Sequence, residues 1–170
     1  VLTELLSRWF PPPLPVHTRN FVRKNPRPLE KVYNLGKKLG EGGMGTVYMV
    51  DHLVSGQQRV CKMIPKSLSI GEIQQILQEI ENMAMLDHPS VCKVYEYFED
   101  EENVYQIMEL CSGGELQGRI NAVFQDGAPR YSEDFIRHVM KQTLKAVAFM
   151  HGARFMHKDL KPQNIMMVED

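Results

Sequence analysis

The sequence has 170 residues, 43% of them hydrophobic and 24% charged, and its 20 Lys and Arg residues against 21 Asp and Glu residues give a formal net charge of −1. This composition is that of a folded globular domain, and it excludes a chain that is disordered throughout. The near-neutral balance provides no overall attraction to nucleic acid or to an anionic membrane surface, so we expect no nucleic-acid partner.

The sequence carries no signal for a membrane span, for secretion or for disulfides. It contains no run of 18 apolar residues, and its first residues lack the basic segment and apolar core of a signal peptide. The three cysteines, Cys61, Cys92 and Cys111, are odd in number and far apart, which favours reduced thiols over a disulfide framework or a zinc site. We therefore expect an intracellular, cytoplasmic protein.

Residues 1–28 are predicted to precede the globular part. Apolar residues from Leu2 to Trp9 fall at helical spacing, but the proline-rich run 11–15 ends any helix and favours polyproline II. Residues 17–28 continue as a basic linker punctuated by prolines. A flexible or loosely docked arm is favoured, and a helix packed on the folded body or a proline-rich ligand for another protein are the alternatives.

Three short runs typical of β-strands begin the globular part, at 33–39, 46–52 and 58–64. A glycine cluster and Ser55–Gly56 separate them, which predicts an antiparallel meander.

An amphipathic helix is predicted next. Ser69 and Glu72 form a capping box, and apolar residues recur at helical spacing from Ile73 to Leu86. Two further strands are predicted at 91–99 and 103–110, joined by an acidic turn, so that five strands and one helix form a small lobe.

The remaining segments are predicted to be mainly helical. A short helix at 115–124 precedes a loop at 126–129, and Ser132 caps a helix that ends at Gly152. We expect the apolar face of this last helix to be partly uncovered; its residues are Ile136, Met140, Leu144 and Val147.

A glycine-rich motif lies between the first two predicted strands. Residues 40–45, Gly-Glu-Gly-Gly-Met-Gly, fit the spacing G-x-G-x-x-G, which alone is a weak signal. In a dinucleotide-binding fold this motif opens a helix, whereas here the β-favouring run 46–50 follows it. The order strand–loop–strand favours a flap over phosphates, because glycines let backbone N–H groups approach phosphate oxygens. A dinucleotide-binding oxidoreductase is therefore the weaker interpretation.

The most specific motif is residues 157–164, His-Lys-Asp-Leu-Lys-Pro-Gln-Asn. It follows the glycine motif, Lys62 and Glu79 in the order and approximate spacing of protein kinases, so the sequence from Tyr33 onward resembles the protein kinase superfamily, Ser/Thr type. The resemblance implies an α+β fold, with a small lobe of five antiparallel strands and one helix followed by the first helices of a mainly helical large lobe. It also implies three regions: a leader and Pro-rich basic linker (1–28), the small lobe and hinge (29–111), and the incomplete start of the large lobe (112–170).

The resemblance implies roles in phosphate transfer from ATP with Mg²⁺, because positioning and charge neutralisation dominate that chemistry. Lys62 would hold the α- and β-phosphates and pair with Glu79; two exposed surface charges are the alternative for this pair. Asp159 would accept or orient the substrate hydroxyl, and Lys161 would lie near the γ-phosphate. Asn164 would bind magnesium through its amide oxygen.

The resemblance also implies an ATP pocket. Met108 takes the gatekeeper position at the start of the hinge, and Val47 and Val60 would form an apolar roof over adenine. Glu115 would contact the ribose or a substrate arginine, or serve as an acid at a helix N-terminus. The implied ATP-binding residues are Leu39, Gly40, Gly42, Gly45, Val47, Val60, Lys62, Met108, Glu109, Cys111 and Glu115.

Residues 79–89, 95–100 and 108–116 resemble the calcium/calmodulin-dependent group of kinases, particularly the calcium-dependent protein kinases of plants and protists. This implies protein substrates and a calcium-binding regulatory domain outside this chain. Lys158 replaces the usual Arg and lacks its bidentate fork, so control by activation-loop phosphorylation is less expected. Gln163 replaces a common Glu and removes one charge that would select a basic substrate.

The sequence has no Asp-Phe-Gly motif, activation loop or Ala-Pro-Glu motif. We therefore expect a part of a longer gene product that does not catalyse alone. A pseudokinase, or an ATP-binding interaction module without catalysis, is the alternative to the kinase.

Overall fold

The computed structural model describes residues 24–43, 45–67, 70–125 and 131–168. The contacts divide the chain into two compact units. The sheet unit comprises the described residues of 24–87 and 92–110, and the helical unit comprises those of 88–91 and 111–168. The predicted leader up to residue 23, the Ser69 cap and the loop at 126–129 lie outside the described residues.

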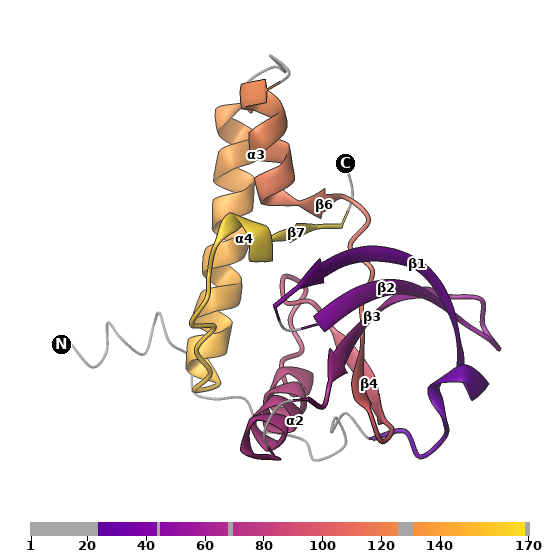
Figure 1. Ribbon diagram of the computed structural model, residues 1–170. Helices are drawn as coiled ribbons and strands as arrows, with labels where there is room; N and C mark the ends of the chain where they lie inside the picture. Colours follow the sequence, from indigo (N-terminus) through magenta and orange to yellow (C-terminus); the bar gives the residue numbers. More distant parts are fainter. Residues whose placement is uncertain (1–23, 44, 68–69, 126–130, 169–170) are drawn as a thin grey trace. The chain divides into compact units, whose positions relative to one another are not determined.

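A five-stranded antiparallel sheet forms the sheet unit, in the spatial order β1-β2-β3-β5-β4 (Figure 1). Every predicted strand is confirmed, with ends shifted by a few residues. The first strand extends into the glycine cluster because Gly42 pairs with Gly45. The strands are β1 (Tyr33–Gly42), β2 (Gly45–His52), β3 (Gln58–Pro65), β4 (Val94–Glu99) and β5 (Asn103–Met108).

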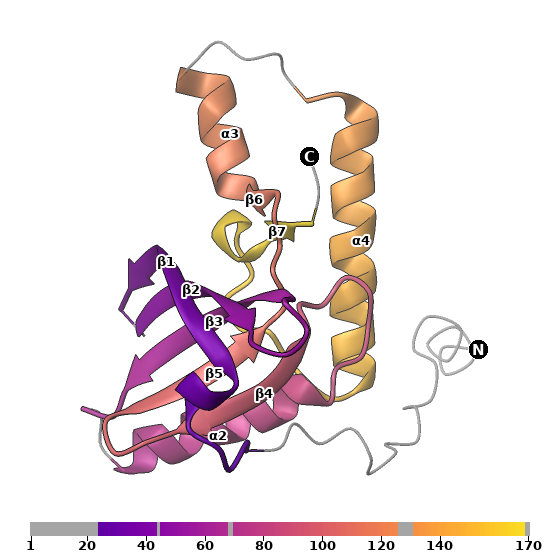
Figure 2. The same ribbon diagram turned by 90° about the vertical axis from the view of Figure 1, so that its right-hand side faces the viewer.

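The predicted amphipathic helix is α2 (Ile70–Ala84), which packs on β4 (Figure 2). Its apolar stripe centres on Ile80, which is buried together with Val94 and Tyr97. The helix ends two residues earlier than the predicted Leu86, in a tight turn in which the Leu86 N–H donates to the Met83 carbonyl at 3.1 Å. The proline that follows shortly afterwards disfavours continuation of the helix.

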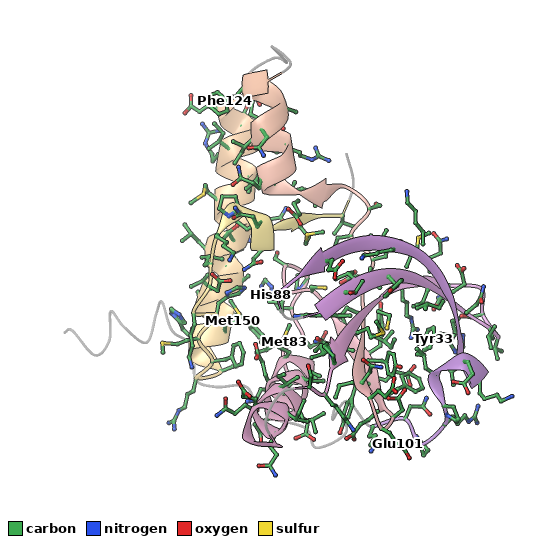
Figure 3. The ribbon with its side chains drawn as sticks, in the orientation of Figure 1. Tyr33, Met83, His88, Glu101, Phe124 and Met150 are labelled. Atoms are coloured by element: carbon green, nitrogen blue, oxygen red, sulfur yellow. The ribbon has the colours of Figure 1, made fainter. Side chains whose placement is uncertain are left out.

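A second cluster of buried side chains lies in the sheet unit and includes Tyr33, Val50, Cys61, Phe98 and Ile107. Figure 3 labels Tyr33, whose ring meets the Phe98 ring edge-on at 5.8 Å between centroids. The short 3-10 helix η2 (Leu29–Lys31) leads into β1, and Leu29 packs against the same cluster. This cluster is built from residues of the strands and of η2, whereas the cluster around Ile80 combines strand residues with the apolar stripe of α2.

The helical unit contains α3 (Leu116–Gln125), α4 (Glu133–Gly152), the 3-10 helix η3 (Pro162–Asn164) and a two-stranded sheet of β6 (Gly114–Glu115) and β7 (Met166–Met167). The Ser132 cap is confirmed, because its Oγ accepts a hydrogen bond from the Phe135 N–H at 3.1 Å.

The long helix α4 buries one face and exposes another. Its buried residues are Val139, Ala146 and Met150. The expected uncovered stripe is present: Ile136, Met140 and Leu144 are 52%, 50% and 60% exposed.

The described helices and the three cysteines concern the membrane span and the disulfides that the sequence did not predict. None of the described helices combines the length and the apolar character that a membrane span requires. The structure places none of the three cysteines in a disulfide. Cys61 is fully buried, and this burial raises its pKa to about 12, so it remains a protonated core residue.

Candidate active site

The glycine-rich motif forms the hairpin between β1 and β2, closed by the pair Gly42 and Gly45. A strand, not a helix, follows the glycines, which confirms the predicted order strand–loop–strand and argues against a dinucleotide-binding fold. Gly45 has φ +133°, and a Cβ added there would lie 2.1 Å from the Met63 carbonyl oxygen. A Cβ at Gly40 or Gly42 would meet no atom within 4 Å, so the backbone there is open to a ligand.

Lys62 lies on β3, and its neighbours across the sheet share its face. It is paired with Val47 on β2 and with Gln106 on β5, while Val60, two residues earlier, is paired with Met108. Side chains of directly paired residues point to the same side of a sheet, as do residues two apart. The predicted roof residues, the gatekeeper and the phosphate-binding lysine therefore lie on one face of the sheet unit.

The predicted pairing of Lys62 with Glu79 is not seen in the described part of the sheet unit, where no ion pair joins the two side chains and Glu79 is exposed. The physical reason lies in the helical spacing. Ile76 and Ile80 direct the buried face of α2 toward the sheet, and Glu79 is rotated by about 100° from Ile80. The Lys62–Glu79 pair stays a prediction, and it requires a different placement of this helix or of the two side chains.

The start of the predicted hinge is held by the two residues just before β4. The Glu109 N–H donates to the Lys93 carbonyl at 2.9 Å, and the Lys93 N–H donates to Glu109 Oε2 at 3.3 Å. The Cys92 thiol lies 3.8 Å from the Glu109 carbonyl oxygen, to which it donates. The hinge is thus fixed by Lys93, a residue that sequence reasoning missed because its contribution is made by backbone groups.

In the helical unit, the segment that begins at Cys111 is joined to the segment after Asn164. Glu115 is paired with Met166, and the Leu116 N–H donates to the Ile165 carbonyl at 2.9 Å. The Ser112 hydroxyl adds a bond to the Val168 carbonyl. Sequence reasoning missed this connection, because strands of two residues leave no periodic pattern.

Asp159, Lys161 and Asn164 come together in one cluster of the helical unit. The Asn164 Nδ2 donates to the Asp159 backbone carbonyl at 2.7 Å and to Asp159 Oδ2 at 3.0 Å. The Lys161 Nζ lies 2.8 Å from the same Oδ2. The Asp159 N–H donates to the His157 carbonyl at 2.9 Å, and Lys158 between them adopts the left-handed conformation with φ +63°.

These contacts determine the charge of Asp159. The hydrogen bond from Lys161 and then the hydrogen bond from Asn164 lower the pKa of this carboxyl below its usual value. The side chain is exposed and remains ionised at neutral pH. It therefore offers a negatively charged oxygen that can accept a hydrogen bond from a hydroxyl group.

The donor set at this cluster fits a magnesium ion. The Asn164 amide nitrogen faces Asp159, which leaves the amide oxygen for a cation, and magnesium prefers such hard oxygen ligands. Within the described ranges no group of three or more His, Cys, Asp or Glu side chains could hold a metal. Magnesium usually keeps several waters and takes further ligands from substrate phosphates, so the Asn164 oxygen could contribute without such a group.

The chain is similar to known protein kinases. The sequence pattern of the protein kinase domain family matches residues 33–170. Calcium-dependent protein kinase 5 of Plasmodium berghei (strain Anka) is 39% identical over 142 residues, covering 83% of this chain and 24% of that protein. Calcium-dependent protein kinase 25 of Arabidopsis thaliana is 39% identical over 145 residues, covering 84% of this chain and 27% of that protein.

A solved structure shares the fold. The twitchin kinase fragment of C. elegans, described as an autoregulated protein kinase with immunoglobulin domains, superposes with a TM-score of 0.77 at 28% identity. The match covers 90% of this chain and 33% of that one. This chain thus spans about a quarter of the length of the curated relatives named above.

Proposed function

The chain belongs to the protein kinase domain family, and on this basis we propose that the protein containing it transfers the γ-phosphate of ATP to Ser or Thr hydroxyls of protein substrates. The observation that carries the proposal is the cluster of Asp159, Lys161 and Asn164, in which the ionised Asp159 carboxylate accepts hydrogen bonds from the Lys161 ammonium group and from the Asn164 amide nitrogen. Phosphate transfer needs such groups to orient a hydroxyl and to offset charge on phosphate.

The sheet unit supplies the groups suited to binding ATP. The open backbone at Gly40 and Gly42 suits phosphate oxygens, and the Lys62 ammonium suits the α- and β-phosphates. Val47, Val60 and Met108, on the face of Lys62, offer apolar surface for adenine.

The helical unit supplies the groups suited to the transfer step. Asp159 accepts a hydrogen bond from the substrate hydroxyl and orients it toward the phosphate, and its lowered pKa keeps it ionised for this purpose. Lys161 lies beside it and offsets the negative charge of the transferred group. Asn164 would hold magnesium, which neutralises charge on the ATP phosphates when it is bound.

The hydroxyl class and the regulation belong to the same proposal. The motif Asp-Leu-Lys-Pro-Gln-Asn at 159–164 is similar to that of Ser/Thr kinases, and Lys161 is the position at which tyrosine kinases usually differ. Two relatives are named calcium-dependent protein kinases, which supports control by a calcium-binding region outside this chain. We also propose an intracellular location, which the odd number and wide spacing of the three cysteines support.

The test is phosphate transfer from Mg-ATP by the full-length protein that contains this chain. Matched basic peptides carrying Ser, Thr or Tyr at one position would be compared, with calcium and with a calcium chelator. We expect transfer to Ser and Thr only, its reduction by the chelator, and its loss in Lys62→Met. Transfer to Tyr would contradict the hydroxyl class. ATP binding without transfer to any peptide would favour the interaction module.

A further inference from the structure

Residues 24 and 25 lie beside β4, which is an edge strand of the sheet. Lys24 forms a parallel bridge with Tyr97, and the Asn25 N–H donates to the Tyr97 carbonyl at 2.8 Å. The sequence placed these residues in a solvated linker, and the structure corrects this: the chain continues the sheet at its edge. Edge strands carry unpaired backbone groups, and this segment satisfies one of them.

The side chains of the same two residues hold acidic groups of β4. The Asn25 Nδ2 donates to Glu96 Oε2 at 2.7 Å, and the Lys24 Nζ lies 2.6 Å from Glu99 Oε2. Glu99 also pairs with Lys66 at 2.7 Å, and these two lysines lower the pKa of its carboxyl.

Glu96 is fixed from its other side as well. Its Oε1 accepts a hydrogen bond from the Tyr33 hydroxyl at 2.7 Å, and Arg59 donates to that hydroxyl at 2.5 Å. The Arg59 guanidinium lies 4.0 Å from the centre of the Tyr95 ring. Asn25 therefore binds a carboxylate held by several partners and partly withdrawn from water, where a hydrogen bond contributes more than an exposed pair does.

Tyr97 connects this edge to α2. Its carbonyl accepts the bond from Asn25, while its side chain is buried in the cluster that contains Ile80 of α2. Among the elements of the sheet unit, β4 is the strand that α2 contacts most extensively. The strand on which α2 packs is thus an edge strand, which is paired with β5 on one side and with residues 24 and 25 on the other.

We propose that residues 24 and 25 form a strap that positions α2, with Asn25 as its main positioning residue. Glu79 precedes the buried Ile80, so the placement of the helix determines whether Glu79 reaches Lys62. The consequence for phosphate transfer rests on the proposed function, whereas the strap's effect on α2 does not.

The test is hydrogen exchange of the α2 amides in the full-length protein. Asn25→Ala removes the hydrogen bond to the Glu96 carboxylate and also the bond that Asn25 Oδ1 accepts from the Arg27 N–H at 3.0 Å. We expect exchange in α2 and β4 to accelerate about tenfold with β1 and β2 unchanged. Lys31→Ala is the matched control, because Lys31 is exposed and its side chain makes no bond with the described residues. Unchanged exchange in α2, or equal acceleration across the whole sheet, would contradict the proposal that residues 24 and 25 position α2.

A rescue separates positioning from general stabilisation. Asn25→Asp places two carboxylates 2.7 Å apart and should accelerate α2 exchange more than Asn25→Ala does. Adding Glu96→Gln restores the hydrogen bond in the reverse direction, because the amide at position 96 then donates to the carboxylate at position 25. Exchange in α2 should return toward the wild-type rate. If the α2 amides of the double variant exchange as fast as those of Asn25→Asp, the assigned contact between residues 25 and 96 is refuted.

Activity provides the second readout. We expect Asn25→Ala to lower kcat about threefold or more while KM for the peptide is retained, because the helix carrying Glu79 is misplaced rather than the peptide site. Accelerated α2 exchange with unchanged kcat would overturn the link to catalysis. If the wild-type protein transfers no phosphate, the proposed function fails, but the exchange measurement still tests whether residues 24 and 25 position α2.

Discussion

Replacing Gly45 by alanine tests how the glycine-rich hairpin is built. A Cβ at Gly45 would lie 2.1 Å from the Met63 carbonyl oxygen, far inside any real contact distance, and the backbone there has φ +133°. Gly43 provides a control in the same hairpin, because a Cβ there would meet no atom within 4 Å. The two substitutions add the same methyl group to the same turn.

The magnitude follows from two costs. A side chain at such a positive φ costs about 1–3 kcal/mol. Relief of the contact would also part β2 from β3 where Thr46 is paired with Met63, at about 1 kcal/mol for each lost hydrogen bond. We therefore expect Gly45→Ala to lower the free energy of unfolding by about 3 kcal/mol. Gly43→Ala should change it by less than about 0.5 kcal/mol.

The assay is urea unfolding of the two variants and the wild type, followed by circular dichroism, with the slopes compared to check that the transition is the same. Hydrogen exchange of the β2 and β3 amides would show whether the destabilisation lies where these two strands pair. Equal unfolding free energies for Gly45→Ala and Gly43→Ala would refute the steric reasoning for this glycine.

Three further predictions concern the catalytic cluster and the buried network. Lys161→Met removes the largest cause of the lowered Asp159 pKa. A carboxyl NMR titration should therefore place this pKa closer to the ordinary range of an aspartate, with protonation beginning at higher pH than in the wild type; an unchanged titration would contradict the assigned cause. Asn164→Ala should raise the magnesium concentration needed for half-maximal phosphate transfer on the order of tenfold, and an unaltered magnesium dependence would remove Asn164 from the metal site. Tyr33→Phe deletes the hydroxyl between Glu96 and Arg59 and should lower the free energy of unfolding by about 1.5 kcal/mol in urea titrations, with the exposed-site variant Lys37→Ala showing no comparable loss.

The elements with strong periodicity could be predicted from the sequence. The alternation in the five strands and the apolar stripe of α2 led to the sheet and the helix that the structure contains. The cluster of Asp159, Lys161 and Asn164 was also accessible, because all three residues lie within one short motif whose local turn brings their side chains together.

The remaining features depend on contacts between distant segments. Asn25 and Glu96 lie 71 residues apart, and the bond between them follows from the sheet order rather than from a local pattern. The two-residue strands β6 and β7 are too short for periodicity to indicate. The Lys62–Glu79 pair depends on the rotation of α2, which its apolar residues determine more strongly than one exposed ion pair can.

The central claim is that Asp159 orients the substrate hydroxyl during phosphate transfer. The most direct measurement is single-turnover transfer from saturating Mg-ATP to a Ser peptide by the full-length protein and by Asp159→Asn, with the ATP dissociation constant measured for both. We predict that the rate falls by roughly 10²–10⁴-fold while ATP affinity is retained. A rate within about threefold of the wild type, at equal ATP affinity, would contradict the assigned role of Asp159.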